Sequence, residues 1–170
     1  MRRRVSGVDE RITTAIAASA DDLLAYVSRR IGPDDAPDLL GETMVVAWRR
    51  VGELPEDPER ARMWLFGIAR GTLLNHARGR RRRWALADRI REHAPEQAAS
   101  SGADAGVEVR DAIARLDADH AEVVRLVHWD GFSLVEVAEL LGIPASTARG
   151  RYQRAKEELR AALSIGAPLA

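Results

Sequence analysis

The sequence predicts an all-α protein of two small helical domains joined by a flexible linker, with a helix-turn-helix in the C-terminal domain. Hydrophobic residues make up 46% of the 170 residues and aromatic residues only 5%, and apolar side chains recur at helical spacing. Residues 93–106 read HAPEQAASSGADAG, which is rich in Ala, Ser and Gly and lacks apolar periodicity. This composition is typical of a linker, so we expect domains at residues 9–92 and 107–165.

Three helices are expected in the first domain, at residues 9–31, about 34–51 and about 59–80. Gly32-Pro33 ends the first helix, and Pro55 and Pro58 make residues 53–59 a loop. Apolar spacing places the inward face of the second helix at Leu40, Met44, Ala47, Trp48 and Val51. The same spacing selects, for the third helix, Trp64, Leu65, Ile68, Ala69 and Thr72.

The helix-turn-helix is predicted from residues 131–163, GFSLVEVAELLGIPASTARGRYQRAKEELRAAL. Ser133 and Glu136 form an S-x-x-E capping box, which starts a short helix. Gly142 ends this helix, and Pro144 suits the start of the next one because its missing N–H would have no partner there. One apolar stripe on the short helix is expected at Leu134, Val137, Ala138 and Leu141.

The second helix of this motif, residues 145 to about 163, opens with side chains that suit phosphates and base edges in a major groove. These side chains are Ser146, Thr147, Arg149, Arg151, Gln153 and Arg154. The residues expected to pack in its later turns are Leu159, Ala162 and Leu163. The alternative is a surface helix whose arginines are merely solvated. Two supporting helices at residues 107–116 and 118–129, the latter capped by Asp117, would complete a four-helix domain.

The formal net charge is zero, but the charged residues are segregated along the chain. Residues 32–59 hold eight acidic residues against two arginines, whereas residues 60–92 hold ten arginines against two acidic residues. This segregation favours a basic face for phosphates and an acidic face for a basic protein surface. Five arginines within residues 78–83 also fit a nonspecific or nuclear-localisation patch, but the accompanying helix-turn-helix favours a specific nucleic-acid function.

Composition argues against several other classes of function. The chain has no cysteine, and its four histidines lack metal-ligand spacing, so we expect neither a disulfide nor a metal site. No apolar run is long enough to cross a membrane and no signal-type hydrophobic core is present, which favours a cytoplasmic protein. Asp34-Asp35 is the only feature that suggests a nucleic-acid enzyme, and we expect no enzyme and no cofactor. Because the chain ends soon after the second domain, no fused regulatory domain is expected.

Two segments resemble the two domains of the extracytoplasmic-function sigma factors of bacterial RNA polymerase. The run DGFSLVEVAELLGIPASTARGRYQRAKEELR, within residues 109–163, is similar to the family's helix-turn-helix. The run APDLLGETMVVAWRR, within residues 34–83, is similar to its most constant helix. The resemblance implies a non-catalytic transcription initiation subunit that binds core RNA polymerase, at the clamp of the largest subunit and at the flap, and that recognises and melts promoter DNA. It also implies an anti-sigma protein as a partner.

The same resemblance assigns residues to each role. Polymerase contact is implied for Asp38, Glu42, Val45, Val46 and Arg49. Recognition and melting of the minus-ten element are implied for Arg60, Arg62, Arg70, Asn75, His76, Arg78, Arg80, Arg81, Arg82 and Arg83. The loop at residues 53–59 would help to trap a base flipped out of the non-template strand. Contact with the minus-thirty-five element is implied for Ser146, Thr147, Arg149, Arg151, Gln153 and Arg154.

The sequence departs from the family pattern at several of these places. Gly41, Gly71 and Gly150 stand where the family commonly has Gln, Asn and Ser. Met44 replaces a frequent Phe, and Gln153 replaces a frequent aromatic residue or His. The main alternative function is a helix-turn-helix regulator that uses its N-terminal helices for dimerisation. That regulator would bind duplex DNA without polymerase, whereas a sigma factor would bind weakly alone and give start-site-specific transcripts with core enzyme.

Overall fold

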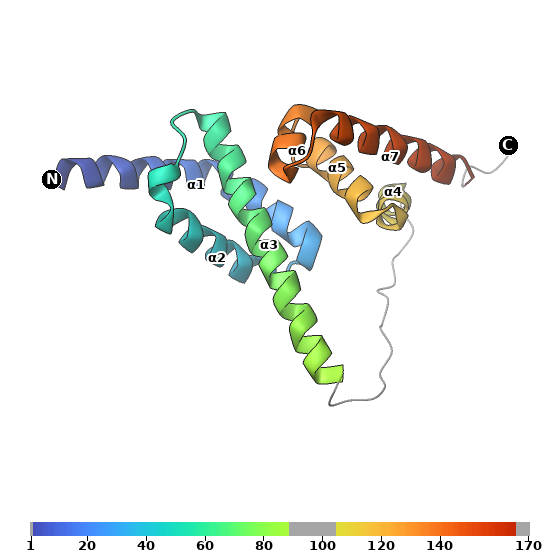
Figure 1. Ribbon diagram of the computed structural model, residues 1–170, viewed down its shortest axis with the longest axis horizontal. Helices are drawn as coiled ribbons and strands as arrows, with labels where there is room; N and C mark the ends of the chain where they lie inside the picture. The colour runs from blue at the N-terminus through green and yellow to red at the C-terminus, as the bar shows by residue number, and fades with distance from the viewer. Residues whose placement is uncertain (1, 89–104, 166–170) are drawn as a thin grey trace. The chain divides into compact units, whose positions relative to one another are not determined.

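The computed structural model describes residues 2–88 and 105–165, and within these ranges the chain is helical without any strand. The chain divides into two units, Met1–Ala94 and Pro95–Ala170. The helices of the first unit are α1 (Arg2–Ile31), α2 (Ala36–Arg49), the short 3-10 helix η1 (Val51–Glu53) and α3 (Pro58–Asp88) (Figure 1). Those of the second are α4 (Ala105–Arg115), α5 (Ala118–His128), α6 (Leu134–Leu141) and α7 (Ala145–Ile165). The predicted all-α fold is confirmed.

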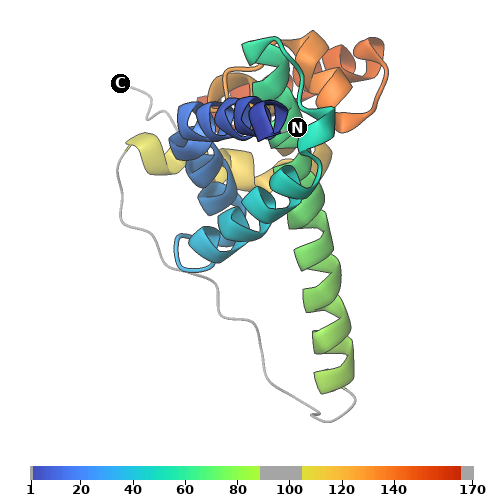
Figure 2. The same cartoon turned by 90° about the vertical axis from the view of Figure 1, so that its left-hand side faces the viewer.

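In the N-terminal unit, α1, α2 and α3 pack against one another in pairs. The largest fully buried apolar side chains of this unit are Ile12, Leu23, Tyr26, Val27, Leu65 and Phe66. The Tyr26 ring meets the Phe66 ring edge-on, with 5.1 Å between centroids, and this contact joins α1 to α3. The C-terminal half of α3 projects beyond α1 and α2 (Figures 1 and 2).

The inward face of α2 differs from the predicted one. Its buried residues are Ala36, Leu39, Thr43 and Ala47. The residues predicted to be buried but found half-buried or exposed are Leu40, Met44, Trp48 and Val51. The prediction gave weight to large apolar side chains, but the inward stripe includes Ala36 and Thr43. The Thr43 hydroxyl donates to the carbonyl oxygen of Leu39 at 2.8 Å, so it is satisfied within the helix and can be buried.

Both long helices of this unit extend beyond their predicted limits. The first begins at Arg2 instead of residue 9, and the third continues to Asp88 instead of residue 80. Because Arg and Ala have high helix propensity, the arginine run prolongs α3 instead of ending it. Up to Arg82, where the described side chains of α3 end, the last buried residue is Leu73, and none of residues 74–82 is buried. This part of α3 therefore presents most of its side chains to solvent.

In the C-terminal unit, α4, α5 and α6 all pack against α7. The residues of its central cluster are Ile113, Ala121, Val124 and Ala155, with Leu116, Tyr152 and Leu159 packed around them. The predicted cap at Asp117 is confirmed, because its carboxylate accepts from the backbone N–H of Asp119 at 2.9 Å. The capping box is also confirmed. The backbone N–H of Glu136 donates to Ser133 Oγ at 3.3 Å, and the backbone N–H of Ser133 donates to Glu136 Oε2 at 2.7 Å.

The turn of the helix-turn-helix follows the predicted chemistry. Gly142 ends α6 with a φ of 66°, a left-handed conformation that favours glycine. The packing predicted for the end of α7 is correct for Leu159 but wrong for Ala162 and Leu163, which are exposed. These two residues follow Leu159, which packs against the cluster of Ile113, Ala121, Val124 and Ala155. Helix α4 begins two residues earlier than predicted, and residues 93–104 of the predicted linker lie outside the described residues.

None of the described helices combines the length and the apolarity that crossing a bilayer requires. Over the same residues, no group of three or more His, Cys, Asp or Glu side chains is placed to hold a metal ion.

Candidate polymerase and nucleic-acid surfaces

The outward face of α2 combines acidic and apolar side chains. Its exposed residues include Asp38, Glu42, Val45, Trp48 and Arg49. Spacings of three and four residues place them along one side of the helix, and Val46 lies half-buried at the edge. We call these six residues the α2 surface. Exposed apolar groups beside charges are typical of a protein-binding surface. Trp48 was not predicted to belong to this surface, because its bulk suggested a core position.

The loop between α2 and α3 is held at both ends. Across η1, Arg50, which precedes the helix, and Glu53 form an ion pair with 2.5 Å between Nη2 and Oε2. The hydrogen bond from Arg50 lowers the pKa of the Glu53 carboxyl from its ordinary value, and the same bond raises the pKa of Arg50. At the other end, the Asp57 carboxylate caps α3 by accepting from the backbone N–H of Arg60 at 2.9 Å. Leu54 lies between these ends with its side chain buried.

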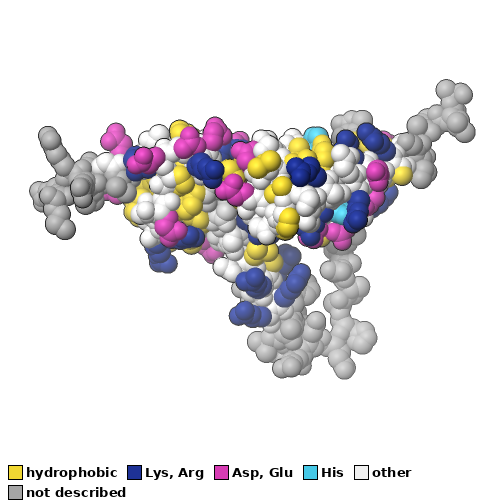
Figure 3. Space-filling model, turned by 45° about the horizontal axis from the view of Figure 1, so that its top comes forward, with side chains coloured by type: hydrophobic (Ala, Val, Ile, Leu, Met, Phe, Trp, Pro, Cys, Tyr) yellow, Lys and Arg dark blue, Asp and Glu magenta, His cyan; other side chains and the backbone are white. Residues whose placement is uncertain are grey.

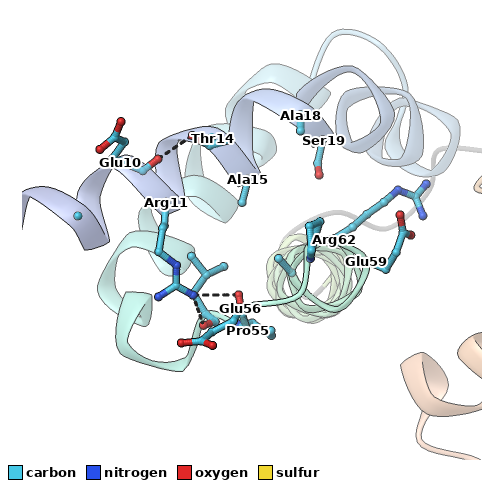
Figure 4. A pocket seen from close by; sticks show the side chains of 14 residues that line it. Glu10, Arg11, Thr14, Ala15, Ala18, Ser19, Pro55, Glu56, Glu59 and Arg62 are labelled. Carbon is cyan, nitrogen blue, oxygen red and sulfur yellow. Dashed lines mark hydrogen bonds between the residues drawn. The ribbon is translucent and has the colours of Figure 1, made fainter.

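A groove of about 560 Å³ lies between α1, this loop and the first turns of α3 (Figure 4). Alanines of α1 and α3 contribute to its walls. Arg11 reaches from α1 to the loop, where its Nη2 donates to the carbonyl oxygens of Leu54 and Pro55 at 3.3 and 3.2 Å. The volume falls within the range of about 300–1,000 Å³ that is typical of sites for small molecules. The role of Arg11 could not be predicted from the sequence, because one arginine in an amphipathic helix gives no signal of a contact 43 residues away.

The arginine-rich part of α3 exposes most of the predicted single-strand contacts. The exposed members are Asn75, Arg78, Arg80, Arg81 and Arg82. Arg70 and His76 are half-buried, and the side chain of Arg83 lies outside the described residues. Arg78 Nη1 lies 3.4 Å from the Asn75 side-chain oxygen, so these two groups are neighbours on one face. Basic side chains gather over the described part of the projecting half of α3 (Figure 3).

Arg60 and Arg62, at the start of α3, have different surroundings. Arg60 is exposed, whereas Arg62 is half-buried. The Arg62 guanidinium lies 4.7 Å from the centroid of the Phe66 ring, and its Nη2 is 3.2 Å from Asp22 Oδ2 on α1. These contacts give Arg62 a role in packing α3 against α1, which sequence analysis did not anticipate. Arg62 also lines the groove, on the side away from Arg11 (Figure 4).

The helix α7 has a packed side and an exposed side. Ala148 and Ala155 are fully buried. Five of the six predicted duplex contacts are exposed, namely Ser146, Thr147, Arg149, Gln153 and Arg154. Gly150 lies among them, and a Cβ added there would meet no atom within 4 Å. The exposed side therefore presents cationic and amide groups around a stretch of bare backbone.

Arg151 is the sixth predicted duplex contact, and it is engaged within the protein. Its Nη2 lies 2.5 Å from Asp119 Oδ2, and its side chain is 27% exposed. A second contact between the same helices joins His120 Nδ1 to Glu158 Oε1 at 2.9 Å. Asp119, His120 and Arg151 line a hollow of about 660 Å³ beside the first turns of α7. Side chains of α5 therefore hold one flank of α7 in place, and sequence analysis missed Asp119 because the pair forms only in the folded unit.

Comparison with known proteins places both units in one family. Residues 15–83 match the family described as Sigma-70 region 2, and residues 106–159 match Sigma-70, region 4. The chain is 29% identical over 168 residues to the ECF RNA polymerase sigma factor SigL of Mycobacterium tuberculosis, covering 94% of this chain and 95% of SigL. It is 33% identical over 150 residues to SigC of the same species, covering 86% and 80%. Identity to the RNA polymerase sigma factor CarQ of Myxococcus xanthus is 30% over 163 residues, covering 94% and 93%.

Solved structures share the fold. CnrH, in complex with the cytosolic domain of CnrY, aligns with a TM-score of 0.65 and 26% identity, covering 98% of this chain and 96% of that one. The sigma factor RpoE of Bartonella quintana, in complex with the anti-sigma factor NepR, aligns with a TM-score of 0.67 and 24% identity, covering 92% and 96%. The two domain matches, in order along one chain, agree with the identity to SigC over most of its length. This chain belongs to the extracytoplasmic-function sigma factors of the sigma-70 family.

Proposed function

We propose that this sigma factor, which directs transcription initiation as its family does, divides its work among three surfaces. The α2 surface binds core RNA polymerase, α3 and the neighbouring groove bind the melted minus-ten element, and α7 binds the minus-thirty-five duplex. The protein contributes no catalytic activity of its own to the reaction. The observation that carries this division is the exposed side of α7. Ala148 and Ala155 are buried on the opposite side of the helix, so the exposed polar residues of α7 face solvent, where DNA can reach them.

The α2 surface suits the clamp of the largest polymerase subunit. Asp38 and Glu42 supply negative charge for a basic partner, and Val45 and Trp48 supply solvent-exposed apolar surface that a partner could bury. Aromatic residues with apolar neighbours commonly provide most of the affinity at a protein interface. The C-terminal unit would contact the flap region, as the family resemblance implies.

The N-terminal unit suits single-stranded DNA. Exposed arginines from Arg78 to Arg82 provide phosphate contacts along the projecting end of α3, and Asn75 provides hydrogen bonds to bases. The groove beside the loop would receive the base that leaves the duplex. Extruding a base costs a few kcal/mol, so a protein that melts DNA needs a site that offsets this cost. The size of the groove and its partly apolar walls support this role.

On α7, Arg149, Gln153 and Arg154 are exposed in the first turns, where recognition helices meet base edges. Arg suits guanine and Gln suits adenine, at about 1–3 kcal/mol of discrimination for each good pair. Arg151 has a carboxylate partner, so we assign it to holding α7 and to the phosphate backbone beside it.

An anti-sigma protein is the remaining proposed partner. The similar protein CnrH was solved in complex with the cytosolic domain of a second protein, CnrY. A protein that covered the α2 surface or the exposed side of α7 would prevent initiation by competing with polymerase or DNA.

Reconstitution with core polymerase on a promoter library tests the proposal. Start-site-specific transcripts are expected with core enzyme, and only weak duplex binding is expected from the chain alone. A helix-turn-helix regulator would give strong duplex binding alone and no change in start sites. Failure of the chain to form a complex with core polymerase would contradict the proposed role of α2.

A further inference from the structure

The segment after η1 is hydrogen-bonded to α1. Pro55 has no N–H to donate, and only Pro55 and Glu56 separate the buried Leu54 from the Asp57 cap of α3. The carbonyl oxygens of Leu54 and Pro55 both accept hydrogen bonds from Arg11 Nη2, at 3.3 and 3.2 Å. One guanidinium therefore joins two successive carbonyls to a helix far away in sequence.

This contact also sets one end of the groove. In Figure 4 the Arg11 side chain extends from α1 to the loop at Pro55 and Glu56, while Ala15, Ala18 and Ser19 follow along the same helix. The length of the arginine side chain spans the distance between helix and loop. A lysine at this place would keep the charge, but its single ammonium lacks the planar fork that fixes the direction of the donors.

We infer that Arg11 is a positioning residue for capture of the extruded minus-ten base, because it holds the loop carbonyls at the distance from α1 that keeps the groove open. The inference rests on the proposed function of the groove. Because Arg11 donates to the loop carbonyls, its proposed effect on DNA is indirect and depends on whether a base is present to enter the groove. This dependence separates it from the arginines of α3, which contact phosphates whether or not a base is present.

The test uses the full chain bound to core polymerase and fluorescent single-stranded oligonucleotides of the non-template minus-ten element. Each oligonucleotide carries an abasic site at one position, and the ratio of the affinities of the intact and abasic strands is measured. The wild-type protein should show one position where loss of the base weakens binding about tenfold, the order expected for loss of one stacked base. Arg11→Lys should reduce this ratio to about twofold and leave affinity for the abasic strand unchanged.

Arg29→Lys is the matched control, because it makes the same exchange on α1 at an exposed residue outside the groove lining, and it should keep the wild-type ratio. Arg11→Gln, which keeps an amide donor without the charge, is measured beside Arg11→Lys, and thermal unfolding establishes that each variant is folded. If both Arg11 variants kept the wild-type ratio of intact-strand to abasic-strand affinity, the inference would be overturned, while the proposed function of the groove would stand. If an abasic site at no position weakened binding by the wild-type protein, the proposed base capture would be wrong, and the inference about Arg11 would be wrong as well.

Discussion

Replacing Trp48 with alanine tests whether the α2 surface binds polymerase. Trp48 exposes 46% of its surface, or roughly 100 Å² of the 150–250 Å² that an aromatic side chain offers. Burying that area against a partner contributes about 2.5 kcal/mol at about 25 cal/mol per Å². Trp48→Ala is therefore expected to weaken binding to core polymerase by about 60-fold, since 1.4 kcal/mol corresponds to a factor of ten.

Fluorescence anisotropy of the labelled chain, titrated with core polymerase, measures this loss directly. Leu24→Ala is the control, because Leu24 is an exposed apolar residue on α1 of the same unit and lies outside the α2 surface. Denaturant unfolding of each variant gives the fraction of folded protein, to which the binding data are corrected.

The two possible environments of Trp48 give opposite results in these measurements. If Trp48 were a core residue, as apolar spacing indicated, Trp48→Ala would lower the free energy of unfolding by about 3–5 kcal/mol and leave the affinity of the folded molecules for polymerase unchanged. If Trp48 is a surface residue that contacts polymerase, Trp48→Ala would mainly reduce the affinity for core polymerase. Wild-type affinity in folded Trp48→Ala would refute the assignment of this face to polymerase.

The remaining predictions concern DNA binding and stability. Arg149→Ala should alter preference at particular upstream bases, whereas joint replacement of Arg80, Arg81 and Arg82 by alanine should weaken binding to all sequences and lower the salt slope by about one per arginine. Competition on a promoter library at two salt concentrations separates the two effects, and identical profiles would contradict the division between α7 and α3. Ser133→Ala removes the cap of α6 and should lower the free energy of unfolding by about 1 kcal/mol in urea, while an unchanged value would show that the cap adds nothing. In the folded chain the pKa of Glu53 is lowered by Arg50, so this pair stabilises above the unfolded pKa of Glu53 and ceases to do so as pH falls through the folded value. The melting temperature of Glu53→Gln should therefore lie below that of the wild type at neutral pH and converge with it in acid, and a difference that persisted in acid would assign it to another cause.

Features that depend on neighbouring residues could be predicted from the sequence. The capping box of Ser133 and Glu136, the cap at Asp117 and the left-handed turn at Gly142 all appear where local chemistry placed them. Each involves groups within a few residues, whose geometry the backbone fixes as soon as the helix forms. On α7, five of the six polar residues chosen from the sequence are exposed, because helical spacing places them on the side opposite Ala148 and Ala155.

Contacts between distant residues could not be predicted in this way. Arg11 meets the loop carbonyls, and Arg151 meets Asp119, only after the helices have packed. Nothing in the sequence near Arg151 distinguishes it from Arg149 or Arg154, which stay exposed. A side chain at the flank of a helix either reaches a neighbouring helix or remains free for a partner, and the position of that neighbour decides which.

Both α2 and α7 pack against their neighbours through buried alanines. The fully buried alanines of these two helices are Ala36, Ala47, Ala148 and Ala155. Because alanine is short, helices that meet at alanines lie close together, and bulky residues beside the contact are left at its margin. A ranking of positions by hydrophobic bulk therefore predicts that Trp48 is buried in the core, whereas in the folded unit its side chain is partly exposed to solvent. In a helical protein rich in alanine, a large apolar side chain next to a buried alanine stripe indicates a surface that a partner can cover, and for α2 we propose that this partner is the polymerase.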